Sequence, residues 1–463
     1  MPLAGRRIGF LLLVFILSAG ACSNDSGSGG NDSGSSGSGD LLGVAPSCPI
    51  SQEQVLSPEL ATMVPNGLDA SLCDFGVFGW ESFLNLVGPA SDANPDSDPS
   101  SGRRRFLVES DYRQYVGPVA DSCAEVGGFG KNVFSTRFVA TKLPGVSPEA
   151  GAGTIYSVEG DSLTGDNVIV YNIRFGADLC DAPGPDLPSN LVEIKTAWRF
   201  LPDGADRSRY YWQALDLPNG EEIILGMVGF HLAQVTDYHP EMIWTSFEHV
   251  DNSPDCVETA TSPPEPSAGW TMTMDDCASC LRSSSDADCT NECSSLNQTR
   301  PPNAQGIYPL NADPTNVCRV YPQGTKEGDL DADENRSNID SLNAQVMGEG
   351  GILASLPASD PQSVWQNYQM IGGIWFNTAS DTTPPTFVLP ASGSNTGAQR
   401  GSLQLANSVM ETTFQGGPVA KVPSAPNAML NCFVCHQTSD YSQTLDVGGL
   451  SHISDHVHGS NPN

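Results

Sequence analysis

Basic residues are scarce in this sequence. Its 463 residues include 54 Asp and Glu but only 21 Lys and Arg, so the formal net charge at pH 7 is −33. A surface of this sign repels phosphate backbones, which argues against nucleic acid as a partner. The charge can steer a basic partner protein toward the chain, although an acidic surface often serves solubility alone.

Several motifs and long apolar runs are missing as well. No P-loop, dinucleotide fingerprint or nucleophile triad is recognisable, so nucleotide-dependent and triad-based chemistry have no support. Beyond the first 21 residues, no segment is apolar enough to cross a bilayer. The sequence therefore directs attention to export signals and cysteine chemistry.

The N-terminal segment has the parts of a secretory signal. Two arginines at 6–7 precede an apolar stretch at 10–17, and small residues at 18–21 lead into Cys22. The apolar stretch is too short to span a membrane. Small residues before Cys22 resemble a bacterial lipobox, so we expect Cys22 to be lipidated; ordinary signal cleavage is the alternative. Ser23, in place of Asp, favours the outer membrane, at its periplasmic face or its surface.

The pattern C-x-x-C-H occurs at Cys432, Cys435 and His436. Two thiols at this spacing can add to the vinyl groups of one haem edge, and the adjacent His then lies under the iron as proximal ligand. The sequence therefore predicts one covalent haem c, and export agrees with it. The alternative is a small disulfide loop with an unrelated His beside it.

The sixth iron ligand would decide the function. Two axial ligands favour electron transfer, whereas an open distal side permits binding of small oxidants. His452, between apolar neighbours, is the leading candidate. The alternatives are a Met (Met410 or Met429), another His such as His456 or His458 in the tail, or no sixth ligand. Because residues 437–463 are too few to enclose a haem, we expect most of the pocket to come from residues before 430.

Thirteen cysteines are present. If Cys22 carries lipid and Cys432 and Cys435 carry haem, an even remainder suggests up to five disulfides in an exported protein. The remaining cysteines are Cys48, Cys73, Cys123, Cys180, Cys256, Cys277, Cys280, Cys289, Cys293 and Cys318. The spacing within 277–293 also fits a four-cysteine zinc site, but an oxidising compartment favours disulfides.

Hydrophobic periodicity predicts an α+β fold with a large antiparallel β-rich domain and peripheral helices. We also expect a disulfide-rich insertion, and we expect the C-terminal haem-attachment segment to pack on the large domain. The expected strands are 168–175, 192–200, 210–215, 223–232 and 242–250, and the expected helices are 69–87, capped by Asp69, and a Ser402-capped helix with a stripe at Leu403, Ala406, Met410 and Phe414. In 192–200 the alternation predicts one covered face and one polar face.

These elements define an expected domain organisation. The parts are a signal peptide at 1–21, the lipidated Cys and a flexible Ser/Gly tether at 22–45, a helix plus antiparallel sheet at 46–250, a Cys-rich irregular insertion at 251–338, a helical and strand continuation at 339–430, and the haem-attachment segment at 431–463.

Two histidines on expected neighbouring strands are candidate catalytic residues. His231 and His249 each end an apolar strand pattern, and a pair of imidazoles there could act on the distal side of a haem or on a substrate. Hydrogen-bonded structural histidines are the alternative.

Several segments carry a family resemblance. They are 192–198 (VEIKTAW), 226–231 (GMVGFH), 244–252 (WTSFEHVDN), 371–375 (IGGIW) and 405–412 (LANSVMET), followed by C-x-x-C-H. In this order they resemble exported bacterial "cytochrome c family" lipoproteins with a single C-terminal haem motif. The resemblance implies haem and export but no particular reaction.

We therefore expect a membrane-tethered, single-haem electron-transfer protein, with a basic redox protein as its candidate partner. The alternatives are a haem enzyme with peroxide, oxygen or nitrogen-oxide chemistry, for which a scaffold of this size leaves room, and a non-haem, disulfide-rich binding lipoprotein.

Overall fold

The computed structural model describes residues 47–412, with gaps, and residues 431–436, 451 and 453. The gaps are 62, 66, 95–97, 116–122, 124–153, 183–186, 217–219, 259–261, 284–288, 290, 301–308 and 377–398. The chain divides into two compact units, Met1–Val44 and Ala45–Asn463, and every described residue belongs to the second.

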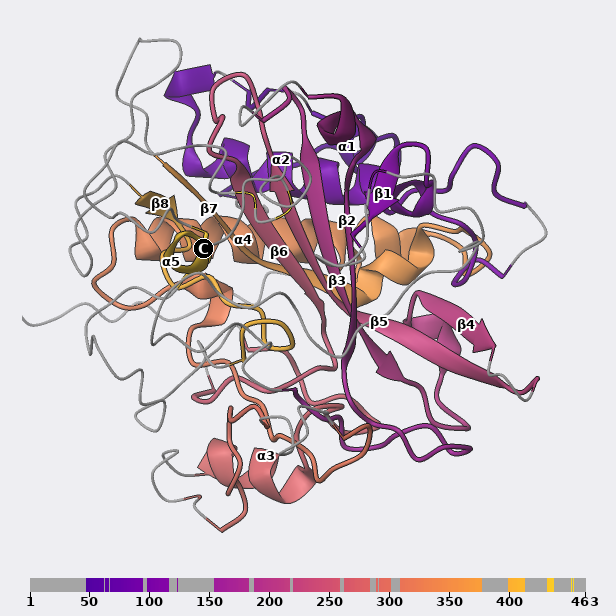
Figure 1. The fold of residues 1–463 in the computed structure, drawn as a ribbon. Coiled ribbons are helices and arrows are strands. Elements are labelled where there is room, and N and C mark those ends of the chain that lie inside the picture. The colour runs from indigo at the N-terminus through magenta and orange to yellow at the C-terminus, as the bar shows by residue number, and fades with distance from the viewer. Residues whose placement is uncertain are drawn as a thin grey trace, which may run out of the picture. The chain divides into compact units, whose positions relative to one another are not determined.

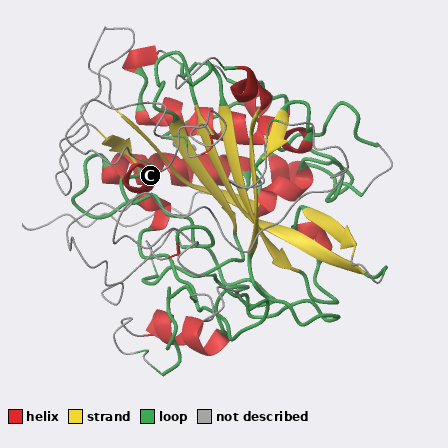
Figure 2. Cartoon of the chain, in the orientation of Figure 1, coloured by secondary structure: helices red, strands yellow, loops and turns green. Residues whose placement is uncertain are grey.

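One antiparallel sheet of eight strands organises the described residues (Figures 1 and 2). Its strands are β1 (Tyr112–Gln114), β2 (Val170–Gly176), β3 (Val192–Phe200), β4 (Trp212–Asp216), β5 (Glu222–Gln234), β6 (Ile243–His249), β7 (Tyr368–Phe376) and β8 (Gln399–Gly401). The order is β1-β2-β3-β5-β6-β7-β8, and β4 pairs with the beginning of β5. The antiparallel β-rich fold predicted from the periodicity is confirmed.

The expected polar face of β3 is buried, so that part of the prediction is wrong. Glu193 and Arg199 are 8% and 5% exposed, and only Lys195 is half-buried. The reason is that both faces of the sheet are covered, one by helices and the other by segments from later in the chain. Alternation in β3 therefore separates two buried environments rather than core from solvent.

Helices α2 (Leu72–Leu86) and α4 (Ala332–Val346) cover one face of the sheet (Figure 1). A capping box starts α2: Ser71 Oγ accepts the N–H of Asp74, and Asp74 accepts the N–H of Ser71. The expected helix is confirmed, but its cap is Ser71, because Asp69 ends a preceding 3₁₀ turn.

The aromatic core lies between α2 and the sheet. The ring of Phe83 stacks on Phe247 with centroids 4.1 Å apart and meets the edge of Phe230 at 5.1 Å. All three side chains are fully buried. This packing fixes the face of β5 and β6 that points toward the helices.

Residues 402–412 cover the opposite face as a series of turns, so the Ser402-capped helix predicted here is wrong. All of these residues are buried, and a single apolar stripe would have left one side exposed. Asn407 Nδ2 donates to Ser246 Oγ and to the carbonyl of Phe247, both at 3.0 Å. Side-chain bonds to the sheet thus replace the helical backbone ladder.

Gly229 permits this close approach. A Cβ at this position would lie 2.8 Å from Cγ2 of Val409 and 2.9 Å from Cε of Met410. A larger residue at position 229 would push the 402–412 segment away from the sheet.

The Cys-rich insertion is held by disulfides, as predicted. Three of the five bridges among the described residues lie within it, namely Cys256–Cys318, Cys277–Cys293 and Cys280–Cys289, and the other two are Cys48–Cys73 and Cys123–Cys180. The four cysteines that could have formed a zinc site form two of these bridges. Cys277 and Cys280 lie on α3 (Asp275–Ser283), and their bridges tie this helix to Cys293 and Cys289 in the chain that follows it. The remaining helices are α1 (Gln52–Leu56) and α5 (Cys432–Cys435).

None of the helices in the described part of the chain combines the length and apolar character needed to cross a membrane.

Candidate functional site

The C-x-x-C-H sequence forms the short helix α5, and residues 431–436 are here called the CxxCH segment. Asn431 caps this helix: its side-chain oxygen accepts the N–H of Phe433 at 3.1 Å. Its Nδ2 donates to Gln399 Oε1 and to the carbonyl of Leu403, both at 2.9 Å. Asn431 is fully buried, so it ties the CxxCH segment to β8 and to the chain that follows β8.

An aromatic platform supports the segment. Phe433 is fully buried, with its ring 4.3 Å from Phe376 and 6.2 Å from Trp244. The half-buried ring of His436 lies 4.3 Å from Trp244, with the two planes inclined by 50°. The backbone N–H of His436 donates to the carbonyl of Cys432 at 2.9 Å. Trp244 therefore orients the imidazole that the sequence predicts to be an iron ligand.

The strand register shows which row of the sheet lies beneath the segment. Glu193, Ala233, Trp244 and Ile374 are consecutive partners on β3, β5, β6 and β7. Opposed residues of paired strands point to the same face. The CxxCH segment therefore packs on the face opposite α2 and α4.

Two residues of the C-terminal tail reach the same place. Ser451 Oγ donates to the buried carboxyl of Glu193, and Ile453 joins the apolar cluster that contains Phe433 and Trp244. Burial raises the pKa of Glu193 to about 7, against a smaller opposing effect of the Ser451 hydrogen bond. Cys22, Met429, His452, His456 and His458 lie outside the described residues.

His231 belongs to an ionic cluster on this face. It occupies the next row of the sheet, where it is paired with Lys195 on β3 and with Ser246 on β6. Its Nε2 lies 2.6 Å from Glu411 Oε2, and Lys195 Nζ lies 3.3 Å from Glu411 Oε1. Burial alone would raise the pKa of Glu411, but His231 and Lys195 outweigh it and lower the pKa to about 2.

His249 occupies a different environment. Strand alternation places Phe247 and His249 on the helix-covered face, away from His231. The backbone N–H of Asp251 donates to Nδ1 of His249 at 3.2 Å, so Nε2 carries the proton and donates to the carbonyl of Arg209 at 2.9 Å. Burial lowers the pKa of His249 to about 4. The two strand histidines therefore do not converge on one site.

Met410 is also remote from this platform. It is fully buried in an apolar cluster with Val409 and Tyr171, whereas Phe433 belongs to another cluster. A core role accounts for its position.

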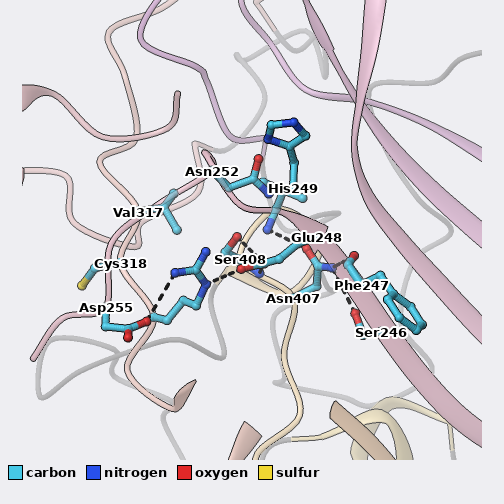
Figure 3. A network of polar contacts seen from close by, with 12 residues as sticks. Ser246, Phe247, Glu248, His249, Asn252, Asp255, Val317, Cys318, Asn407 and Ser408 are labelled. Carbon is cyan, nitrogen blue, oxygen red and sulfur yellow. Dashed lines mark hydrogen bonds and ion pairs between the residues drawn. The ribbon is translucent and has the colours of Figure 1, made fainter. Parts of the chain in front are cut away.

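A buried ionic network near the opposite end of β6 from Trp244 was not predicted (Figure 3). Glu248, fully buried on β6, accepts hydrogen bonds from Ser408 N at 3.0 Å, from Ser408 Oγ at 2.6 Å, and from Arg319 Nε. Arg319 Nη1 also donates to Asp255 Oδ1 at 3.3 Å. Figure 3 shows Glu248 pointing toward Ser408 and His249 pointing the other way. The network joins the sheet, the Cys-rich insertion and the 402–412 segment.

The donor set of the CxxCH segment suits a haem c, with two thiols and one imidazole within five residues. Among the described residues, no group of three or more His, Cys, Asp or Glu side chains is arranged to hold a metal ion. Comparisons with protein-family models, with curated proteins and with solved structures found no match for this chain. Its function is therefore argued from the site itself.

Proposed function

We propose that this chain is an exported, lipid-anchored protein with one haem c, which transfers electrons at the periplasmic face or surface of the outer membrane. The observation that carries the proposal is the placement of the C-x-x-C-H sequence. It forms one capped helical turn, its Phe433 is fully buried, and the ring of His436 packs on Trp244. An accidental motif in an exposed tail would have no such support.

Each residue of the segment has a role in the proposal. Cys432 and Cys435 would form the thioether bonds, and His436 would be the proximal ligand of the iron. Haem c, when bound, would supply an iron that can take up and release one electron. Trp244 restricts rotation of the His436 imidazole, and Asn431 fixes the start of the helical turn.

His452 is the proposed distal ligand. Its neighbours Ser451 and Ile453 contact Glu193 and the apolar cluster around Phe433, so the tail returns to the CxxCH segment at this point. A second axial ligand from the tail would give a six-coordinate iron, which favours electron transfer.

A haem enzyme acting on peroxide, oxygen or nitrogen oxides is the second candidate. The observation in its favour is the cluster of Lys195, His231 and Glu411, one row of the sheet away from Trp244 and on the same face. His231 could transfer a proton there. His249 does not favour this candidate, because it lies on the other face and both ring nitrogens bond to the backbone.

Carbon monoxide distinguishes the two candidates. Full-length protein matured with haem is reduced, and its visible spectrum is recorded with and without carbon monoxide, for the wild type, His452→Ala and the tail control His456→Ala. Electron transfer predicts a low-spin spectrum that carbon monoxide leaves unchanged in the wild type and in His456→Ala, and a response in His452→Ala. A wild-type spectrum that is high-spin and shifts with carbon monoxide would instead support the enzyme, and His231→Ala would then be tested for turnover.

A further inference from the structure

A pocket of about 150 Å³ lies at the N-terminal end of α2, beside the end of β7 and the beginning of β8. Its lining residues are Gly67, Ala70, Ser71, Leu72, Phe75, His239, Glu334, Trp375, Phe376 and Arg400. A volume of this size has room for several waters or for one small organic molecule. Phe376 also contacts Phe433, so one side chain separates the pocket from the CxxCH segment.

The inner wall contains a buried His–Glu pair. His239 is 3% exposed, and its Nδ1 lies 2.8 Å from Oε1 of Glu241, which is fully buried. The other ring nitrogen, Nε2, has no hydrogen-bond partner among the described residues, and neither has Oε2 of Glu241. An unmet buried polar atom costs on the order of 1–3 kcal/mol. A ligand bound in the pocket could supply the hydrogen-bond partner that Nε2 of His239 lacks.

Burial raises the pKa of Glu241, against a smaller opposing effect of its hydrogen bond with His239. A carboxylic acid at Glu241 donates its proton to Nδ1 of His239, and the single proton of the imidazole is then on Nε2. His239 therefore presents an N–H donor to the pocket.

Two further donors face the same space. Arg400 uses Nε for Asp331, and its terminal NH₂ groups have no partner among the described residues. Ser71, the cap of the 15-residue helix α2, and its first residue Leu72 also line the pocket. The capping box uses the N–H groups of Ser71 and Asp74, so the N–H groups of Leu72 and Cys73 remain without an intrahelical acceptor, and the helix dipole favours negative charge there. The exposed Glu334 is the acid in the lining.

The rest of the wall is apolar. Phe75 and Trp375 stack at 3.7 Å with nearly parallel planes, and both are buried. The pocket thus combines donors for an oxyanion with a flat aromatic wall for a short hydrocarbon part.

We propose that this pocket binds a small carboxylate. Nε2–H of His239 and the guanidinium of Arg400 donate to the carboxylate oxygens, the start of α2 faces the negative charge, and the Phe75–Trp375 stack covers the carbon chain. The site is independent of haem, and it is an anion site in a chain whose formal net charge is −33.

The test uses full-length protein titrated with acetate and with acetamide, its neutral isostere, by calorimetry and by NMR of labelled histidine. We expect acetate to bind about tenfold more tightly than acetamide and to shift the Nε2 resonance of His239. Arg400→Gln should weaken acetate binding about tenfold, and Ala70→Leu should abolish binding by filling the pocket.

Glu334→Gln is the matched control, because it removes a charge from the same lining and should leave acetate affinity unchanged or raise it. Circular dichroism and the thermal midpoint of each variant show that the fold is retained. Equal affinity for acetate and acetamide, no saturable binding of either, or full affinity in Arg400→Gln would overturn the proposal.

Discussion

Replacement of Glu248 by Gln should destabilise the protein strongly. Gln has the same size but no charge, so Arg319 would keep only Asp255, at 3.3 Å, as an ionic partner. The NH₂ group of the new side-chain amide would also have to face either Arg319 Nε or the N–H of Ser408, and both of these groups are hydrogen-bond donors. Breaking one side of a buried pair costs about 3–5 kcal/mol. Because Asp255 remains, we expect a loss of about 3 kcal/mol, at the lower end of this range.

The loss is measured as the free energy of unfolding in urea, with the disulfides intact. Glu265→Gln is the matched control: it removes the acid of the pair between Arg282 and Glu265, whose side chains are 27% and 44% exposed. An exposed pair contributes little, so the control should change stability by less than about 1 kcal/mol. A loss below about 1 kcal/mol in Glu248→Gln would refute the assignment of this network as a main tie between the sheet and the Cys-rich insertion.

Three other predictions concern stability. The pKa of His249 is about 4 in the fold and 6.5 in the unfolded chain, so the free energy of unfolding should fall by roughly 3 kcal/mol as the pH decreases from 6.5 to 4. When unfolding is measured at a series of pH values, His249→Phe should lose most of this pH dependence. The pKa of Glu193 is raised to about 7 from 4.5, so ionisation of this carboxyl destabilises the fold as the pH rises through this interval. The stability of Glu193→Gln relative to the wild type should therefore increase by roughly 3 kcal/mol between pH 4 and pH 8. A difference that stays constant over this range would contradict burial of the Glu193 carboxyl as the cause. Replacing Cys277 and Cys293 by Ala should cost about 3 kcal/mol, as expected for a bridge that closes a loop of this length, whereas a zinc chelator should leave the melting temperature of the wild type unchanged.

The strands were readable from the sequence because β-branched and aromatic residues recur along them. The segment predicted at 192–200 is β3, Val192–Phe200, and the segment predicted at 242–250 is β6, Ile243–His249. Burial was less predictable, because local alternation does not reveal which distant segment covers the second face of a sheet. The environment of Glu193 depends on Ser451, more than 250 residues later.

The helices show where local patterns mislead. Helix α4 begins inside the segment that was expected to be irregular. The sequence did not reveal this helix because polar residues dominate it, and only Ile339, Leu342 and Val346 mark its buried apolar stripe. In 402–412 a helical stripe was present, but the side chains of Asn407 and Ser408 bond to the sheet instead. Competition between side-chain and backbone hydrogen bonds decided this segment.

The candidate site was predictable only where its residues are contiguous. Cys432, Cys435 and His436 stand together in the sequence, and the structure shows them on a supported turn. His239 had no sequence signal beyond Glu241 two residues later, because it lies in a loop without periodicity. The contact between His231 and Glu411 spans 180 residues, a separation at which a single sequence carries no pairing information.

Covalent haem content tests the central claim most directly. The protein is expressed with a c-type maturation system, purified, extracted with acidified acetone, and examined as its reduced pyridine complex, together with a Cys432→Ser, Cys435→Ser double variant. The account predicts one haem per chain that resists extraction in the wild type and is absent from the variant. A colourless wild-type protein, or haem that extracts freely, would contradict it and leave a disulfide-rich binding lipoprotein as the better description.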